Sequence, residues 1–138
     1  MNAPLRCLIV DDVQLARDRL RRLLGSIDDI EILGEAANVT DALELVHEHA
    51  PDLIFLDIEM PELNGIDVLR EMNRRQIKTR VLMISRFTTA GAQVTTDALI
   101  EGAFDFILKP SGSDPAENKK SLREALAEKI DALREARS

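Results

Sequence analysis

Short apolar runs alternate along the chain with stretches of helical periodicity, and this alternation constrains the fold more than any other feature. Most of the runs are apolar over three to five consecutive residues, which is typical of strands buried on both faces of a parallel sheet. The predicted strands are Leu5–Val10, Ile30–Ala36, Asp52–Leu56, Arg80–Ile84 and Phe104–Leu108. Five strand–helix units in succession predict an α/β fold, (βα)5, in which helices cover both faces of a doubly wound parallel sheet. For a chain of 138 residues we expect the flavodoxin-like strand order 2-1-3-4-5.

The stretches between the runs predict amphipathic helices. The apolar face of the first carries Val13, Ala16, Leu20, Leu23 and Leu24. Its opposite, solvent-facing side is expected to carry Arg17, Asp18, Arg21 and Arg22. The fifth helix can run to the C-terminus. We expect one domain over residues 1–130, with 131–138 forming the end of the last helix or the start of a linker to an output domain that is absent from this chain.

Composition and charge exclude several classes of partner. Lys and Arg number 18 and Asp and Glu 25, so the formal net charge is −7, which disfavours duplex DNA and anionic membranes. Without Trp or Tyr the chain has no aromatic platform for single-stranded bases. A lone Cys7 excludes a disulfide framework and is expected as an apolar filler on a strand. No segment is long enough for a signal peptide or a membrane span, so we expect a cytoplasmic protein.

Polar side chains follow four of the five predicted strands. Asp11 and Asp12 follow the first strand, Asp57 the third, Ser85 the fourth and Lys109 the fifth. Any one of these residues alone would be interpreted as a helix cap, a turn residue or a solvated side chain. In the expected strand order, however, the first, third and fourth strands are neighbours, and their carboxyl ends meet at the edge where such folds bind ligands.

The joint arrangement predicts phosphoryl chemistry at a metal site. Two negative charges ~6 Å apart repel by about 3 kcal/mol at an effective dielectric of ~20, so clustered carboxylates call for a cation. Oxygen ligands without His or Cys favour Mg²⁺. Asp57 is then a plausible carboxylate nucleophile, Mg²⁺ and Lys109 would offset the charge of a phosphoryl group, and Ser85 could hydrogen-bond it.

From residue 5 to about residue 130 the sequence resembles the receiver (CheY-like) domains of response regulators. The resemblance rests on the order and spacing of five short motifs: Val10-Asp11-Asp12, Leu56-Asp57, Met60-Pro61 with Gly65, Ile84-Ser85 and Lys109-Pro110. It implies that Asp57 is phosphorylated by a sensor histidine kinase of the CheA type. It also implies Mg²⁺ bound by the carboxylates of Asp11, Asp12 and Asp57.

The resemblance implies further roles within the same site. The backbone carbonyl of Glu59 would be another metal ligand, and Lys109 would pair with the phosphoryl group. Ser85 would be the switch hydroxyl and Phe106 the aromatic side chain that changes rotamer on activation. The surface of the fourth helix, fifth strand and fifth helix would then change its affinity for an output domain in cis or a partner protein in trans.

Two longer segments resemble the regulatory half of chemotaxis protein-glutamate methylesterases, the CheB family. One is Leu56-Asp57-Ile58-Glu59-Met60-Pro61, and the other runs from Ser85 through Thr88, Gly91, Val94, Ala98 and Gly102 to Phe106. The chain has no G-x-S-x-G nucleophile turn of an esterase. We therefore expect either a free-standing receiver or the regulatory half of such an enzyme, and no enzymatic activity beyond its own phosphorylation and dephosphorylation.

Other interpretations are weaker. A phosphatase of the haloacid-dehalogenase type also forms an aspartyl phosphate, but it needs a second Asp two residues after the nucleophile, where this chain has Glu59. A pseudo-receiver that is never phosphorylated would not need the full set of polar residues. His47 and His49 lie two apart on a predicted helix and are expected at the surface rather than as shared metal ligands. Many receivers have a neutral residue at the position of Glu59 and a small residue at the position of Arg86. We expect both side chains to border the site mouth and to modulate the lifetime of the phosphorylated state.

Overall fold

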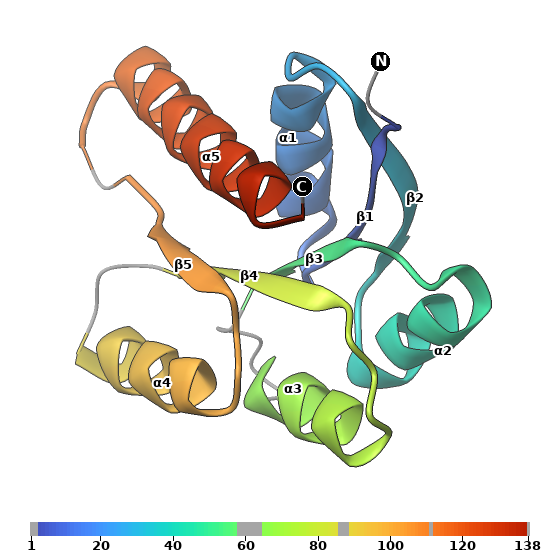
Figure 1. Cartoon of the computed structure of the whole chain (residues 1–138). Coiled ribbons are helices and arrows are strands. Elements are labelled where there is room, and N and C mark those ends of the chain that lie inside the picture. Colours follow the sequence, from blue (N-terminus) through green and yellow to red (C-terminus); the bar gives the residue numbers. More distant parts are fainter. Residues whose placement is uncertain (1–2, 58–64, 86–88, 111, 138) are drawn as a thin grey trace.

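The described residues of the computed structural model form five strands and five helices in strict alternation (Figure 1). The structure describes residues 3–57, 65–85, 89–110 and 112–137. The strands are β1 (Leu5–Val10), β2 (Ile30–Ala36), β3 (Leu53–Asp57), β4 (Arg80–Ser85) and β5 (Asp105–Leu108). The helices are α1 (Gln14–Gly25), α2 (Val39–His49), α3 (Gly65–Arg74), α4 (Thr89–Ile100) and α5 (Pro115–Arg137).

All the strands pair in parallel, in the order β2-β1-β3-β4-β5. This confirms the predicted doubly wound fold and its strand order. The predicted ends of three strands were wrong by one residue. Asp57 pairs with Ile84 inside the ladder, so β3 ends on its carboxylate residue instead of before it. At its other end β3 begins at Leu53, so Asp52 precedes the strand, and its side chain accepts the backbone N–H of Arg6 at 2.9 Å.

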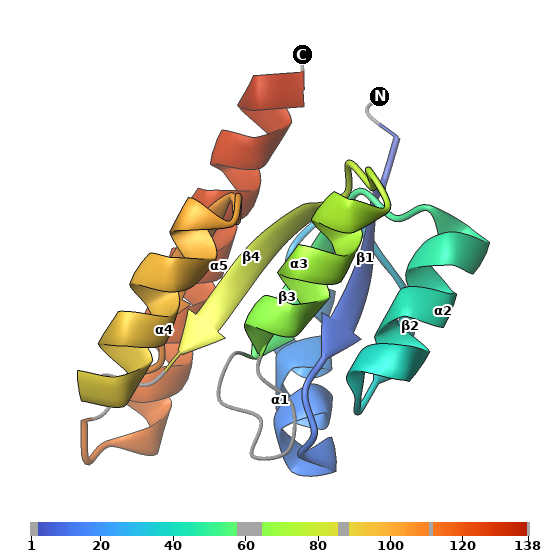
Figure 2. The same cartoon turned by 90° about the horizontal axis from the view of Figure 1, so that it is seen from below.

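Helices cover both faces of the sheet, and each face has its own core. In Figure 1, α1 and α5 lie on one side of the sheet and α2, α3 and α4 on the other, and Figure 2 shows the latter three from their own side. Alternate residues of β1 serve the two cores: Cys7 and Ile9 pack toward α1 and α5, and Leu8 and Val10 toward the other helices. Burial on both faces explains why each central strand contains a continuous apolar run.

The C-terminal helix is anchored along most of its length. Arg123 donates to the backbone carbonyl of Ser26 at the end of α1, and Lys129 pairs with Asp105 of β5 at 2.7 Å. Leu133 is buried and Arg134 donates to two carbonyls of the α1–β2 loop, so α5 stays packed beyond residue 130. Within the described part of the chain, none of the helices combines the length and the apolar character that crossing a membrane requires.

Candidate functional site

The register between β1 and β3 places Asp11 and Asp57 next to each other at the end of the sheet. Val10 of β1 pairs with Leu56 of β3, so the residues that follow, Asp11 and Asp57, stand side by side at the carboxyl edge of the sheet. β1 lies between β2 and β3, at the point where the chain reverses its direction of winding. Ligands of doubly wound folds bind at this edge, so the strand order itself assembles the candidate site.

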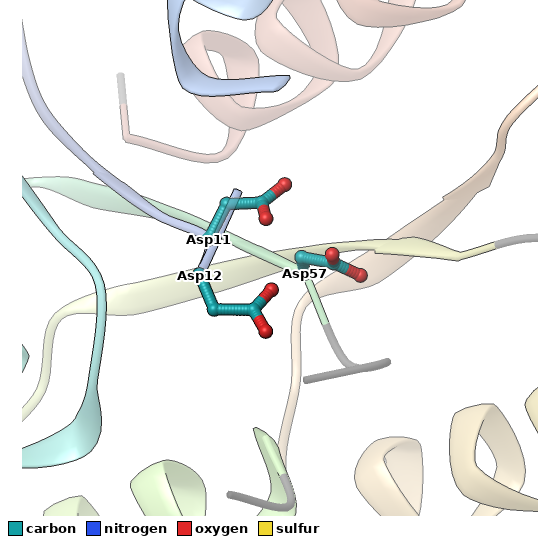
Figure 3. A group of neighbouring side chains, drawn as sticks. All are labelled: Asp11, Asp12 and Asp57. Carbon is teal, nitrogen blue, oxygen red and sulfur yellow. The ribbon is translucent and has the colours of Figure 1, made fainter. Parts of the chain in front are cut away.

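Three carboxylates meet at this edge. Asp11, Asp12 and Asp57 each offer one oxygen, and these oxygens all lie within 4.8 Å of one another. Figure 3 shows Asp11 and Asp12 projecting from consecutive positions after β1, beside Asp57 at the end of β3. Asp11 and Asp57 are buried, whereas Asp12 is exposed. A compact set of hard oxygen donors, open on one side, fits a small divalent cation such as Mg²⁺ with room for water or phosphate oxygens.

The cluster is electrostatically costly without a cation. Burial raises the pKa of Asp11 to about 6, and the nearby charge of Asp57 acts in the same direction. A hydrogen bond from the Val13 backbone N–H to Asp11 Oδ1, at 2.9 Å, acts in the opposite direction but is outweighed. The ionised form of Asp11 is therefore disfavoured in the metal-free protein.

This raised pKa predicts how the stability of the metal-free protein varies with pH. Because the folded protein holds the Asp11 proton up to about pH 6 and the unfolded chain releases it near 3.8, the free energy of unfolding falls as pH rises through this window. Between pH 5 and about pH 7.5 we expect a loss of roughly 1–2 kcal/mol. Thermal unfolding in EDTA at both pH values measures it. Asp11→Asn should lack this part of the loss, and an identical loss in that variant would contradict the assignment to Asp11.

Lys109 and Ser85 complete the edge of the site. Lys109 Nζ lies 3.7 Å from Asp57 Oδ2, and its backbone N–H donates to the carbonyl of Ser85 at 2.6 Å. Ser85 is the last residue of β4 and is fully buried. A cavity of about 640 Å³ opens beside Asp57 and Lys109 and continues between α1 and α5. The site therefore combines a carboxylate cluster, one nearby cation and a hydroxyl with space for a ligand.

Phe106 lies on β5 rather than at the edge. It pairs with Met83 of β4, is partly buried, and packs against the core beneath α2, α3 and α4. Glu59 and Arg86 lie outside the residues that the structure describes, so their predicted places at the site mouth stay predictions. Cys7 is buried, as expected, and burial raises the pKa of its thiol to about 12. His47 is exposed and His49 partly so.

The sequence interpretation missed Arg17 and Glu35. Helical periodicity predicted Arg17 on the solvent-facing side of α1, but its side chain is only 16% exposed. It turns back to the Asp11 carbonyl and to Glu35 of β2, at 2.7 and 3.2 Å. The available signal for Glu35 was a charged residue near the carboxyl end of a strand, but β2 also carries Glu31, and periodicity alone could not link either residue to Arg17.

The chain is similar to a known domain family and to several curated proteins. Residues 7–125 match the sequence profile of the response regulator receiver domain. A protein-glutamate methylesterase/protein-glutamine glutaminase of Treponema denticola is 42% identical over 126 residues, which cover 91% of this chain and 34% of that protein. The corresponding protein of Alkalilimnicola ehrlichii is 44% identical over 128 residues, covering 93% of this chain and 32% of its own. The chain thus spans about a third of the length of these curated relatives.

Solved structures give the same grouping. The response regulator domain of Thermotoga maritima CheB superposes with a TM-score of 0.80 at 39% identity, covering 94% of this chain and 96% of that one. A chain from the CheX–CheY–BeF3–Mg²⁺ complex of Borrelia burgdorferi superposes with a TM-score of 0.71 at 31% identity, covering 91% of this chain and 89% of its own.

Proposed function

Because this chain belongs to the response regulator receiver family, we propose that it is a phosphorylation-controlled switch in which Asp57 accepts a phosphoryl group from a sensor histidine kinase of the CheA type. The observation that carries the proposal is the convergence of Asp11, Asp12 and Asp57 within 4.8 Å, with Lys109 beside Asp57. A carboxylate nucleophile beside a metal site and an ammonium group suits phosphoryl transfer, because the cations offset the charge of the phosphoryl group.

In the proposed transfer, one Asp57 carboxylate oxygen attacks the phosphorus atom of a phosphohistidine. The new O–P bond forms as the P–N bond breaks, and the electron pair of that bond stays on the imidazole nitrogen of the donor. Lys109 would hold a phosphoryl oxygen through its ammonium group, since its Nζ already lies 3.7 Å from Asp57 Oδ2. The Ser85 hydroxyl, at the end of the neighbouring strand, would donate to another oxygen.

Mg²⁺ is the cofactor that we propose for this site. Asp11, Asp12 and Asp57 would hold it, together with the backbone carbonyl of Glu59. When bound, it would offset the negative charge that develops on the phosphoryl oxygens. Its positive charge would also favour the ionised form of Asp11, whose pKa is raised to about 6 in the metal-free protein by burial and, to a smaller extent, by the charge of Asp57.

We propose that the output passes through β5 and its neighbouring helices. Movement of Ser85 toward the phosphoryl group would free space for Phe106 to turn inward, and Ser85 and Phe106 lie on adjacent paired strands. The surface formed by α4, β5 and α5 would then change its affinity for a partner. The phosphoryl group can shift this equilibrium only through its different interactions with the two states.

The domain boundary and the parent protein are part of the proposal. Residues 1–130 would form the receiver, and 131–138 would be the end of its last helix or the start of a linker to an output domain. The curated relatives are about three times longer than the matched region, which favours the regulatory half of a CheB-type protein-glutamate methylesterase over a free-standing receiver. The reading frame beyond Ser138 distinguishes the two, because an esterase domain with a nucleophilic Ser would follow in the first case.

Phosphoryl uptake from a small donor tests the proposed function. Acetyl phosphate with Mg²⁺ should add one phosphoryl group, about 80 Da, and EDTA should suppress this because the carboxylate cluster repels an anionic donor. Intact-protein mass spectrometry measures the adduct. No adduct with Mg²⁺ would contradict the proposal. Sustained turnover of p-nitrophenyl phosphate would instead support a phosphatase of the haloacid-dehalogenase type.

A further inference from the structure

Arg17 of α1 binds the backbone of the turn that carries Asp11 and Asp12. The Arg17 guanidinium donates from Nη1 to the backbone carbonyl of Asp11 at 2.7 Å and from Nε to Glu35 Oε1 at 3.2 Å. We propose that Arg17 is a positioning residue that fixes the Asp11–Asp12 peptide for metal binding. This inference rests on the proposed function, because it assigns a role toward the Mg²⁺ that the proposal requires.

Other groups bind the N–H and the carboxylate of Asp11, and Arg17 binds its backbone carbonyl. The Asp11 backbone N–H donates to Ala36 of β2 at 3.0 Å, and its carboxylate accepts from the Val13 N–H at 2.9 Å. The carbonyl belongs to the peptide group that joins Asp11 to Asp12. Holding its oxygen restrains the peptide plane, and with it the position of the Asp12 Cα from which the side chain extends.

Asp12 depends on this support more than its neighbours do. Asp57 is embedded in the β3–β4 ladder and Asp11 is buried, whereas Asp12 is exposed. An exposed carboxylate that must act as a ligand is held by its backbone when packing does not hold its side chain. A small tilt of the peptide would move its oxygens away from the other two carboxylates.

Glu35 restrains the side chain of Arg17. It lies on the edge strand β2, and its two carboxylate oxygens accept separately from Arg17 at 3.2 Å and from Arg21 at 2.8 Å. The side chains of Arg17 and Glu35 are 16% and 23% exposed, so this pair is far better shielded than a surface ion pair. Glu35 also balances the charge of Arg17, and the planar fork lets one guanidinium serve both acceptors, which the single ammonium of a lysine does less well.

Arg21 provides a matched control within the same helix. It is also an arginine bound to Glu35, but its side chain is 48% exposed, and its Nε donates to Glu35 rather than to the turn. Arg21→Ala therefore removes a similar charge and an ion pair with the same glutamate. A difference between the two alanine variants isolates the bond to the Asp11 carbonyl.

The experiment measures Mg²⁺ binding by calorimetry for the unmodified chain, Arg17→Ala, Arg17→Lys and Arg21→Ala, with each melting temperature recorded in EDTA. Support groups behind metal ligands are worth 10–100-fold in affinity, so we expect Arg17→Ala to bind Mg²⁺ about tenfold more weakly. Arg17→Lys should recover only part of the loss, and Arg21→Ala should stay within about twofold of the unmodified chain.

Equal Mg²⁺ affinities for Arg17→Ala and Arg21→Ala would overturn the inference. If Arg17→Ala does not fold, full Mg²⁺ affinity in a folded Arg17→Lys would overturn it in the same way. Phosphoryl uptake by the unmodified chain is followed in parallel. Failure of that uptake contradicts the proposed acceptor role, whereas normal uptake with unchanged Mg²⁺ binding in the Arg17 variants contradicts the positioning role alone.

Discussion

Asp57→Asn is expected to abolish phosphoryl uptake from acetyl phosphate in the presence of Mg²⁺. The amide of asparagine is nearly isosteric with the carboxylate but is not a competent nucleophile, so the O–P bond cannot form. The substitution also removes one negative charge from a crowded cluster, so the metal-free variant should fold at least as stably as the parent chain. Mass spectrometry should therefore show no adduct on a protein whose melting temperature is preserved.

Asp67→Asn is the matched control for this experiment. Asp67 is an exposed residue of α3 whose side chain lies 3.9 Å from Arg70, away from the three clustered carboxylates. The same chemical change there should leave uptake intact. An adduct of equal yield on Asp57→Asn would mean that another residue accepts the phosphoryl group, and peptide mapping of the labelled chain would identify it.

The sheet was predictable because its strands follow a simple physical rule. A central parallel strand has no solvent-facing side, so β1, β3 and β4 had to contain continuous apolar runs, and they do, at residues 7–10, 53–56 and 81–84. The ends of strands follow a weaker rule. Asp57 is hydrophilic, yet it pairs within the ladder, whereas Asp52 lies just outside the strand although its backbone is hydrogen-bonded to Arg6 and Arg80. Hydropathy alone does not distinguish these two positions.

The acidic cluster was predictable from strand order, but its support was not. Any parallel sheet in the order 2-1-3-4-5 brings the residues after β1 and β3 together, so Asp11 and Asp57 needed no side-chain detail. Arg17 instead depends on how α1 packs against β2. Periodicity gives the side of the helix on which a long side chain begins, not the carbonyl to which its guanidinium returns.

The fourth helix shows a similar limit. Ala98 and Leu99 are neighbouring apolar residues near its end, yet Ala98 is buried whereas Leu99 is 39% exposed. Ile100, which follows, is 77% exposed. An apolar pattern that is continuous around the end of a helix does not define a single face, so packing against the sheet decides which residues are covered.

Asp12→Ala is expected to separate the electrostatic and metal-binding roles of the cluster. In EDTA the variant should be more stable than the parent chain, because Asp12 is exposed and its loss relieves repulsion without leaving a buried group unpaired. With Mg²⁺ at about ten times the dissociation constant of the parent chain, the parent should gain ~1.4 kcal/mol in its free energy of unfolding. The variant should gain little, because one of its three carboxylate ligands is missing.

Thermal unfolding with and without Mg²⁺ makes the comparison, and Glu48→Ala controls for the change in net charge. Glu48 is an exposed residue of α2 outside the cluster. Its substitution should change the free energy of unfolding in EDTA by no more than about 0.5 kcal/mol. The increase in that free energy on adding Mg²⁺ should be the same as in the parent chain. The decisive observation is the order of the two melting temperatures. It should invert, with Asp12→Ala melting above the parent chain in EDTA and below it in saturating Mg²⁺. An order that stays the same in both buffers would exclude Asp12 from the metal site, because a purely structural effect is independent of the ion.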